Sequence, residues 1–289
     1  MASKHGQLAV FLCAVLWSTS GLFIKLLDWH PILIAGARSL VAGFFMLLLT
    51  RTRRTRQTKK PHPFVFWAGS VSYAATMLLF VIANKLTASA NAILLQYSAP
   101  VWAALFGWAL AKERPRREHW LALVVVMAGL VLFFRDGLTG GSLLGDLLAV
   151  ISGILFGLNS VFMRMNKEGE PADIMMVSHF LTAAFALPFC FMYTPALTLP
   201  NMAAVLFMGI FQIGFSSVLF GYGVKHISAV QAMLTAMIEP VLNPVWVLLV
   251  TGEKPSLSAL AGGCLIIGAV VVSSVIIQKN QYEQKVRCG

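Results

Sequence analysis

One acidic residue, Glu239, lies near the centre of a long apolar stretch, Ala229–Val250. An unpaired carboxylate in such surroundings is costly, so an ionisable group there is treated as functional by default. Burial favours the neutral carboxyl group, which would let Glu239 bind and release a proton near neutral pH. The same group could pair with a ligand ammonium, or could bond structurally to backbone freed by Pro240 and Pro244.

Polar residues recur every four positions around Glu239, at Gln231, Thr235 and Asn243. A helix turns about 100° per residue, so each step of four drifts by only about 40°. The four side chains would therefore form a slowly turning polar stripe. Lipid does not tolerate such a stripe, so we expect it to face protein or a water-filled cavity.

Further polar and aromatic residues inside apolar stretches are candidate contacts for a small molecule. Aromatic faces can bind an ammonium group, whereas small hydroxyls can equally serve close helix packing. The additional candidates are Trp17, Ser20, Tyr73, Asn91, Tyr97, Trp102, Asn159 and Gln212.

Two basic side chains, Arg38 and His179, occupy matching places in the two halves of the chain. Arg38 could bind a ligand carboxylate or take part in charge pairing, although a structural bond to backbone carbonyls is the favoured interpretation. His179 could titrate, or could simply be a buried hydrogen-bonding residue.

Three prolines, Pro100, Pro240 and Pro244, interrupt helical hydrogen bonding in two apolar stretches that correspond to each other. Each removes a backbone bond and can kink its helix. We expect them to act as hinges.

The amino-acid composition indicates that these residues lie in a membrane protein. Hydrophobic residues make up 58% of the 289 residues, charged residues 11%, and the mean hydropathy is +0.79. A soluble enzyme, a disulfide scaffold and a disordered chain are excluded, because soluble domains carry roughly 25% charged residues. A membrane-spanning helix needs about 20 mostly apolar residues. Ten stretches qualify, namely Leu8–Leu27, Pro31–Thr50, Phe64–Ala83, Ala90–Ala111, Glu118–Phe134, Leu143–Met163, Ile174–Tyr193, Met202–Val224, Ala229–Val250 and Leu257–Ile277. The sequence therefore predicts an all-α integral membrane protein.

The basic residues predict its orientation. With the N-terminus in the cytoplasm, most of the 22 lysine and arginine residues fall on cytoplasmic segments, as the positive-inside rule requires. Ten spans would place both termini in the cytoplasm. The four cysteines have no metal-site or disulfide spacing, and we expect no metal and no cofactor.

The second half of the chain repeats the first at an offset of about 140 residues. Thr87–Pro115 corresponds to Ile227–Pro255, which aligns Pro100 with Pro240. Each repeat, residues 1–138 and 139–289, would hold five spans. An odd number of spans forces the two repeats to insert with opposite orientations. Inverted repeats of this kind are typical of secondary transporters, whose substrate sites lie near the bilayer midplane between the repeats.

These motifs resemble a known family. The segments Trp17-Ser18-Thr19-Ser20 and Ala37-Arg38-Ser39-Leu40, with the two repeated runs, are similar to the EamA-type ten-helix transporters of the drug/metabolite transporter superfamily. The resemblance implies two inverted five-helix units around a central cavity lined by the first four helices of each. It also implies transport of small organic metabolites, often outward, and the family includes amino-acid exporters.

The function expected from these observations is secondary transport of a small organic metabolite. We expect an exporter of amino-acid-like compounds that works by alternating access, and proton coupling is left open. The alternative within the same fold is a multidrug or organic-cation efflux carrier. An integral membrane enzyme is disfavoured, because no nucleophile, base and metal cluster is evident. We expect a monomer in the cell membrane, with a small-molecule substrate and no nucleic-acid partner.

Overall fold

The computed structural model describes residues 2–19, 23, 27–53, 62–138, 142–166, 169–251 and 256–288. Within these residues every regular element is a helix. Eight helices in this part of the chain are long and apolar enough to cross a membrane, and two shorter apolar helices cover Lys4–Trp17 and Ala229–Leu242. The predicted all-α membrane fold is confirmed, whereas the count of ten spans stays a prediction.

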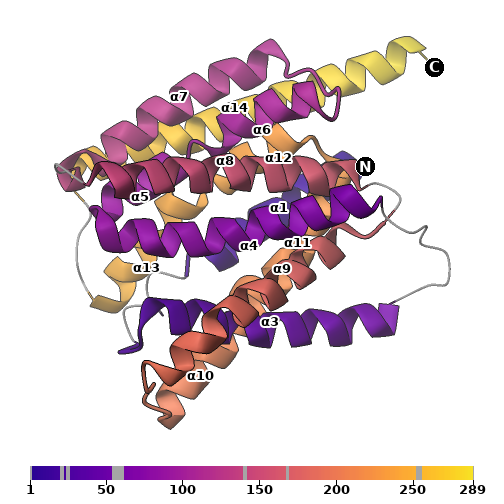
Figure 1. Ribbon diagram of the computed structural model, residues 1–289. Coiled ribbons are helices and arrows are strands. Elements are labelled where there is room, and N and C mark those ends of the chain that lie inside the picture. The colour runs from indigo at the N-terminus through magenta and orange to yellow at the C-terminus, as the bar shows by residue number, and fades with distance from the viewer. Residues whose placement is uncertain are drawn as a thin grey trace.

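The helices form one bundle (Figure 1). In chain order they are α1 (Ala2–Trp17), α3 (Pro31–Arg53), α4 (Pro63–Leu86), α5 (Ser89–Gln96), α6 (Ala99–Ala109), α7 (Arg117–Phe134), α8 (Leu143–Met165), α9 (Pro171–Ala186), α10 (Leu199–Phe207), α11 (Ser216–His226), α12 (Ala229–Ala236), α13 (Glu239–Thr251) and α14 (Leu257–Cys288). Short 3₁₀ helices follow α7 at Arg135–Gly137 and α9 at Leu187–Phe191. The ends of α1 and α14 that carry the chain termini lie at the same end of the bundle (Figure 1).

Local sequence explains where several helices begin. Prolines occupy the first turn of α4, α9 and α10, where the missing N–H would have no helical partner anyway. Ser228 caps α12, because its hydroxyl oxygen accepts a bond from the backbone N–H of Gln231.

Three of the predicted continuous spans are interrupted. Ala90–Ala111 divides into α5 and α6, and Ala229–Val250 divides into α12 and α13. Pro100 and Pro240 are each the second residue of the second half-helix, so the breaks fall just before the two prolines. The span predicted at Met202–Val224 contains a π-helical segment, Met208–Phe215, between α10 and α11.

Close packing on α3 accompanies this π-helical segment. A Cβ atom on Gly209 would lie 2.5 Å from the Val41 side chain and 2.9 Å from the Arg38 carbonyl oxygen. Such segments shift the register of a helix by one residue and are frequent at functional sites. The segment brings Gln212 to face α3, as described below.

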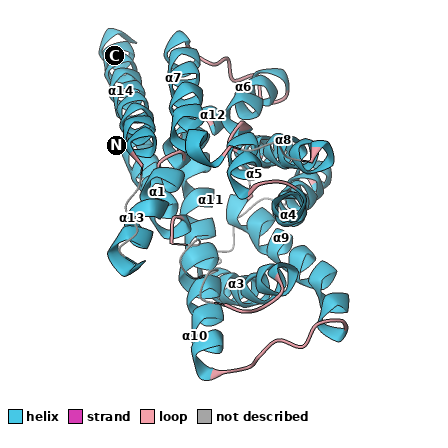
Figure 2. Ribbon diagram, turned by 90° about the vertical axis from the view of Figure 1, so that its left-hand side faces the viewer, coloured by secondary structure: helices cyan, strands magenta, loops and turns pink. Residues whose placement is uncertain are grey.

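Helix contacts occur in matched pairs. The pair α4–α8 has its counterpart in α11–α1, and α5–α8 has its counterpart in α12–α1. The pairs α3–α9 and α7–α14 each join corresponding helices of the two halves. An approximate twofold relation between the halves would produce this pattern. Helices α7 and α14 lie side by side at the edge of the bundle (Figure 2). The repeat bounds and their inverted membrane orientation stay predictions.

The helices α7 and α14 meet through glycines. A Cβ atom on Gly262 would lie 2.5 Å from the Gly129 carbonyl oxygen and 2.5 Å from the Phe133 backbone nitrogen. Backbone atoms cannot move aside as a flexible side chain can, so any larger residue must push the two helices apart. Small residues at a contact between membrane helices allow this close approach.

We expect Gly262→Val to lower the stability of the protein by about 1–3 kcal/mol, the range found for overpacking in a filled interior. The matched control is Gly268→Val on the same helix, because a Cβ atom on Gly268 meets nothing within 4 Å. Thermal unfolding of the purified protein in detergent measures both. Equal melting temperatures for the two variants would contradict the packing.

Candidate functional site

The two helix breaks adjoin each other. Tyr97 caps the C-terminus of α5 at the first break, and Glu239 is the first residue of α13 at the second. The Tyr97 hydroxyl hydrogen-bonds to the Glu239 carboxyl group. The positive end of the α13 dipole also favours a negative charge at Glu239. Glu239, which belongs to the second half of the chain, is thus held at the helix break of the first half.

A charge of opposite sign lies nearby. Arg38 on α3 interacts electrostatically with Glu239 and with Tyr73. Its Nη1 donates to Oε1 of Gln212, in the π-helical segment, at 3.3 Å. The buried Nε atom of Arg38 has no hydrogen-bond partner among the described residues. Gln212 therefore holds the guanidinium in place, while the Nε–H group of Arg38 can still donate a hydrogen bond to another group.

The neighbours of this charge pair are more deeply buried than the pair itself. Tyr73 is 1%, His179 0% and Gln212 2% exposed, whereas Arg38 and Glu239 are both partly exposed. Cys13 on α1 and Tyr73 on α4 also interact electrostatically with Glu239. Groups from α1, α3, α4 and α5 thus surround the Glu239 carboxyl group.

Aromatic rings from four helices converge beside these charges. The Trp17 ring lies 5.3 Å from that of Phe220 and 6.0 Å from that of Phe156, measured between ring centroids. The Tyr73 ring lies 6.0 Å from that of Phe156. Trp17 Nε1 and the Tyr73 hydroxyl are buried without a hydrogen-bond partner in the described part of the chain. Two polar donors thus lie within an otherwise apolar, closely packed cluster.

Sequence reasoning missed Phe156 and Phe220. A signal for Phe156 was present, because the repeat offset of 139 residues that aligns Leu16 with Leu155 also aligns Trp17 with Phe156. Phe220 had a weaker signal, because the repeat aligns it with Phe80, and a phenylalanine matched to a phenylalanine in an apolar span does not point to a site.

His179 and Asn159 are fully buried and join neighbouring helices. His179 Nε2 shares a hydrogen bond of 3.0 Å with the Ser217 hydroxyl, and its ring meets that of Tyr73 edge to face. The Asn159 side-chain amide donates to the Gly69 carbonyl oxygen at 3.0 Å. These bonds link α9 to α11 and α8 to α4.

Other predicted residues lie elsewhere. Trp102 donates to the Ser98 hydroxyl at 3.1 Å and stacks on Phe106. Asn91 is buried on α5. Ser20 lies outside the described residues, and so do the side chains of Asn243 and Pro244.

The polar stripe does not run along one continuous helix as predicted, because α12 ends at Ala236 and α13 begins at Glu239. Gln231 and Thr235 are buried on α12, where the Thr235 hydroxyl donates to the Gln231 carbonyl oxygen. The turn between the two helices changes the direction in which side chains project. Spacing alone therefore does not place these two side chains on the same face as Glu239.

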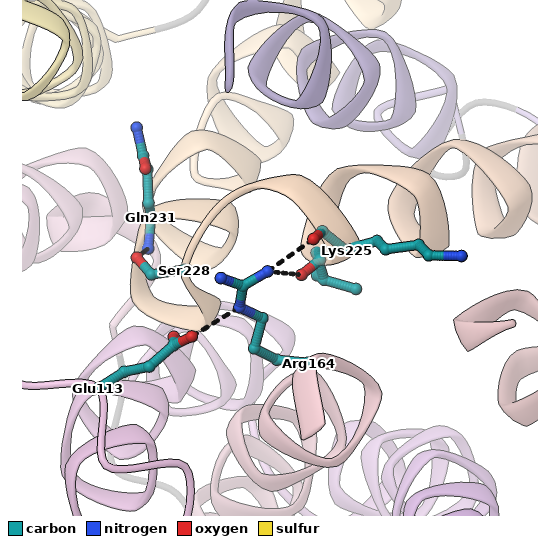
Figure 3. A network of polar contacts seen from close by, with 6 residues as sticks. Glu113, Arg164, Lys225, Ser228 and Gln231 are labelled. Carbon is teal, nitrogen blue, oxygen red and sulfur yellow. Dashed lines mark hydrogen bonds and ion pairs between the residues drawn. The ribbon is translucent and has the colours of Figure 1, made fainter. Parts of the chain in front are cut away.

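A second polar network lies where α11 ends (Figure 3). Arg164 Nε donates to Glu113 Oε1 at 2.7 Å. Its Nη1 donates to the carbonyl oxygens of Val224 and Lys225, at 3.2 and 2.6 Å. The guanidinium thereby satisfies the C-terminal carbonyls of α11 and connects them to the first half of the chain. The Lys225 ammonium in turn pairs with Glu170 at 3.0 Å.

Relatives of the chain are transporters where their names give a function. It is 28% identical over 277 residues to the uncharacterized transporter YwfM of Bacillus subtilis (strain 168), covering 93% of each chain. It is 26% identical over 245 residues to the pseudopaline exporter CntI of Pseudomonas aeruginosa (strain UCBPP-PA14), covering 82% of this chain and 84% of the relative.

A solved crystal structure shares the fold, with a TM-score of 0.83 at 22% identity over 96% of this chain and 98% of that one. The model of the EamA-like transporter family matches twice, at residues 4–135 and 143–275. The two matches together cover most of the chain. The chain therefore belongs to the EamA-like transporter family, and it is a multi-pass membrane transporter rather than an enzyme.

Proposed function

We propose that this transporter exports a small zwitterionic, amino-acid-like metabolite by alternating access, and that Glu239 exchanges a proton for the ammonium group of the substrate. The observation that carries the proposal is the charge pair at the helix breaks. Arg38 from the first half and Glu239 from the second interact electrostatically, and both are partly exposed. Because groups from four helices surround Glu239, we infer that this exposure faces the interior of the bundle.

A zwitterion matches both charges. Its carboxylate would bind the Arg38 guanidinium, whose Nε lacks a partner among the described residues. Its ammonium would bind Glu239, and its side chain would lie against the rings of Trp17, Phe156 and Phe220. Charge-assisted hydrogen bonds of this kind are roughly twice as strong as neutral ones.

Proton exchange follows from the chemistry of a single acid. A protonated Glu239 no longer attracts an ammonium group, so the proton and the substrate compete for the same carboxylate. A carrier that releases substrate when it takes up a proton on the outside, and the reverse on the inside, uses the inward proton gradient to drive export. The Tyr97 hydroxyl would hold the carboxylate in place between the two events.

The helix breaks before Pro100 and Pro240 support their proposed role as hinges. Each proline lacks the backbone N–H that a continuous helix would use at the break, so fewer backbone bonds oppose tilting of the half-helices there. The proposal places the protein in the cell membrane as a monomer, with both termini in the cytoplasm. The name of the Pseudomonas relative supports an outward direction of transport.

An organic cation is the second candidate substrate. The aromatic rings around Trp17 and the carboxylate of Glu239 favour it, because both attract cations. Arg38 distinguishes the two candidates, since a simple cation gains nothing from a guanidinium in the site.

The first test reconstitutes the purified protein into liposomes that contain a pH-sensitive dye, and adds amino acids or organic cations. We expect substrate-dependent proton movement in the wild type and its loss in Glu239→Gln. The matched control is Asp28→Asn, which removes an exposed carboxylate outside the bundle interior. Tracer flux without a proton signal, unchanged in Glu239→Gln, would contradict proton exchange at this residue.

The second test compares each transported amino acid with the amine that lacks only its carboxylate. In Arg38→Gln we expect the KM for the amino acid to rise about tenfold or more, the effect of losing one charge-assisted bond of about 1.5–3 kcal/mol. Transport of the amine should remain, which also shows that the variant is folded. An equal loss for both compounds would assign Arg38 a structural role only.

A further inference from the structure

A cavity of about 200 Å³ lies at the end of the bundle where α12 begins, beside the Arg164 network (Figure 3). Its wall is built from α6, the segment Glu113–Arg116, His226 at the end of α11, and residues of α7, α8, α12 and α14. None of the residues at the Arg38–Glu239 site lines it. The cavity is therefore a separate feature, and an inference about it does not depend on the proposed transport mechanism.

Two buried side chains in this wall each hold an unused hydrogen-bond donor. His119 is 5% exposed, and its Nδ1 accepts a bond from the backbone N–H of Arg116 at 3.0 Å. In the neutral ring the proton must then lie on Nε2, which has no partner among the described residues. Gln231 is 3% exposed, and its amide nitrogen likewise has no partner in that part of the chain. Buried donors without partners are uncommon and costly, so each needs an explanation.

The charges around the cavity are predominantly positive. Arg114, Arg116 and Arg164 line it, and Glu113 is the one acidic residue of the lining that the structure records. Glu113 is bonded to Arg164, which offsets one of the three positive charges. A further acid, Glu118, interacts electrostatically with His119 from the same helix.

The first turn of α12 adds to this field. Ser228, Ala229, Val230 and Gln231 all line the cavity, and they form the positive end of that helix. Helix N-termini bind phosphate and other anions where side-chain donors converge on them. Here the side-chain donors are the Nε2–H group of His119, the amide of Gln231 and the arginines of the lining.

We propose that this cavity is a binding site for a phosphate group, contributed by a lipid headgroup or by a free phosphate anion. Nε2–H of His119 and the amide of Gln231 donate to its oxygens, while Arg114 and Arg116 balance its charge. Residues of α7 and α14 line the cavity, and these two helices lie at the edge of the bundle (Figure 2), where a lipid headgroup would approach it.

Two variants test the site without removing the fold. His119→Glu keeps an acceptor at the third helical position, where glutamate is a preferred capping residue, but it replaces the donor with a negative charge. Arg114→Gln removes one exposed charge from the lining. The matched control is Arg117→Gln, which removes the same charge three residues away at an exposed position outside the lining.

The experiment offers the full-length protein a lipid headgroup and a free anion separately. Native mass spectrometry from mixed micelles measures retention of phosphatidylglycerol against phosphatidylcholine, and thermal unfolding measures the effect of inorganic phosphate. We expect wild type and Arg117→Gln to bind in at least one assay. In His119→Glu and Arg114→Gln the affinity should fall about tenfold, as expected when a charge-assisted contact is lost.

Retention of phosphatidylglycerol assigns the site to a lipid headgroup, and stabilisation by phosphate alone assigns it to a free anion. Equal losses in Arg114→Gln and Arg117→Gln would show nonspecific attraction to positive charge and would overturn the proposal. Absence of binding in both assays would overturn it as well. If His119→Glu does not fold, the comparison of Arg114→Gln with Arg117→Gln still tests whether the cavity binds the phosphate group.

Discussion

The meeting of two interrupted helices, at Tyr97 and Glu239, is the constraint around which the bundle is arranged. A membrane offers no water to unpaired backbone groups, so a helix can be broken only where protein surrounds the break. Helix α8 provides this cover for the first break through its glycines. A Cβ atom on Gly153 would lie 2.7 Å from the Gln96 carbonyl oxygen, and one on Gly157 would lie 2.7 Å from that of Ala99. The face of α8 that packs against the break must therefore consist of glycines or other very small residues.

The same constraint explains why the charged groups are found where they are. Glu239 and Arg38 interact with each other across the two halves of the chain, and Gln212 reaches Arg38 from the π-helical segment. The second network, around Arg164, follows the same logic at the end of α11. Its guanidinium satisfies backbone carbonyls that a helix terminus leaves open. In both places an irregularity of the backbone and a charged side chain occur together.

Hydropathy predicted the membrane fold, and Pro100 and Pro240 marked two of the three interrupted spans, because each signal depends on a property of a single stretch of chain. The π-helical segment was not predicted. The acid Glu239 was predictable for the same reason, since one charge in an apolar stretch is visible without knowing its neighbours. Partners could not be predicted in this way. How separate helices are rotated relative to one another decides which side chains meet. The bonds from Tyr97 to Glu239 and from Arg38 to Gln212 depend on it, and so does the position of Gln231 in the cavity beside the Arg164 network. The one-residue shift of a π-helical segment and the turn after Ala236 both change which side chains face each other.

The two halves of the bundle match in their contacts but not in their chemistry. Glu239 in the second half corresponds to Ala99 in the first, at the same place beside the break. A pair of chemically identical halves would exchange shapes between two states of equal free energy. A carboxylate on one side alone removes that equality, because the acid has a different environment in each state. In the proposed alternating-access cycle, the resting population would therefore be biased toward one side of the membrane before any substrate or gradient is present.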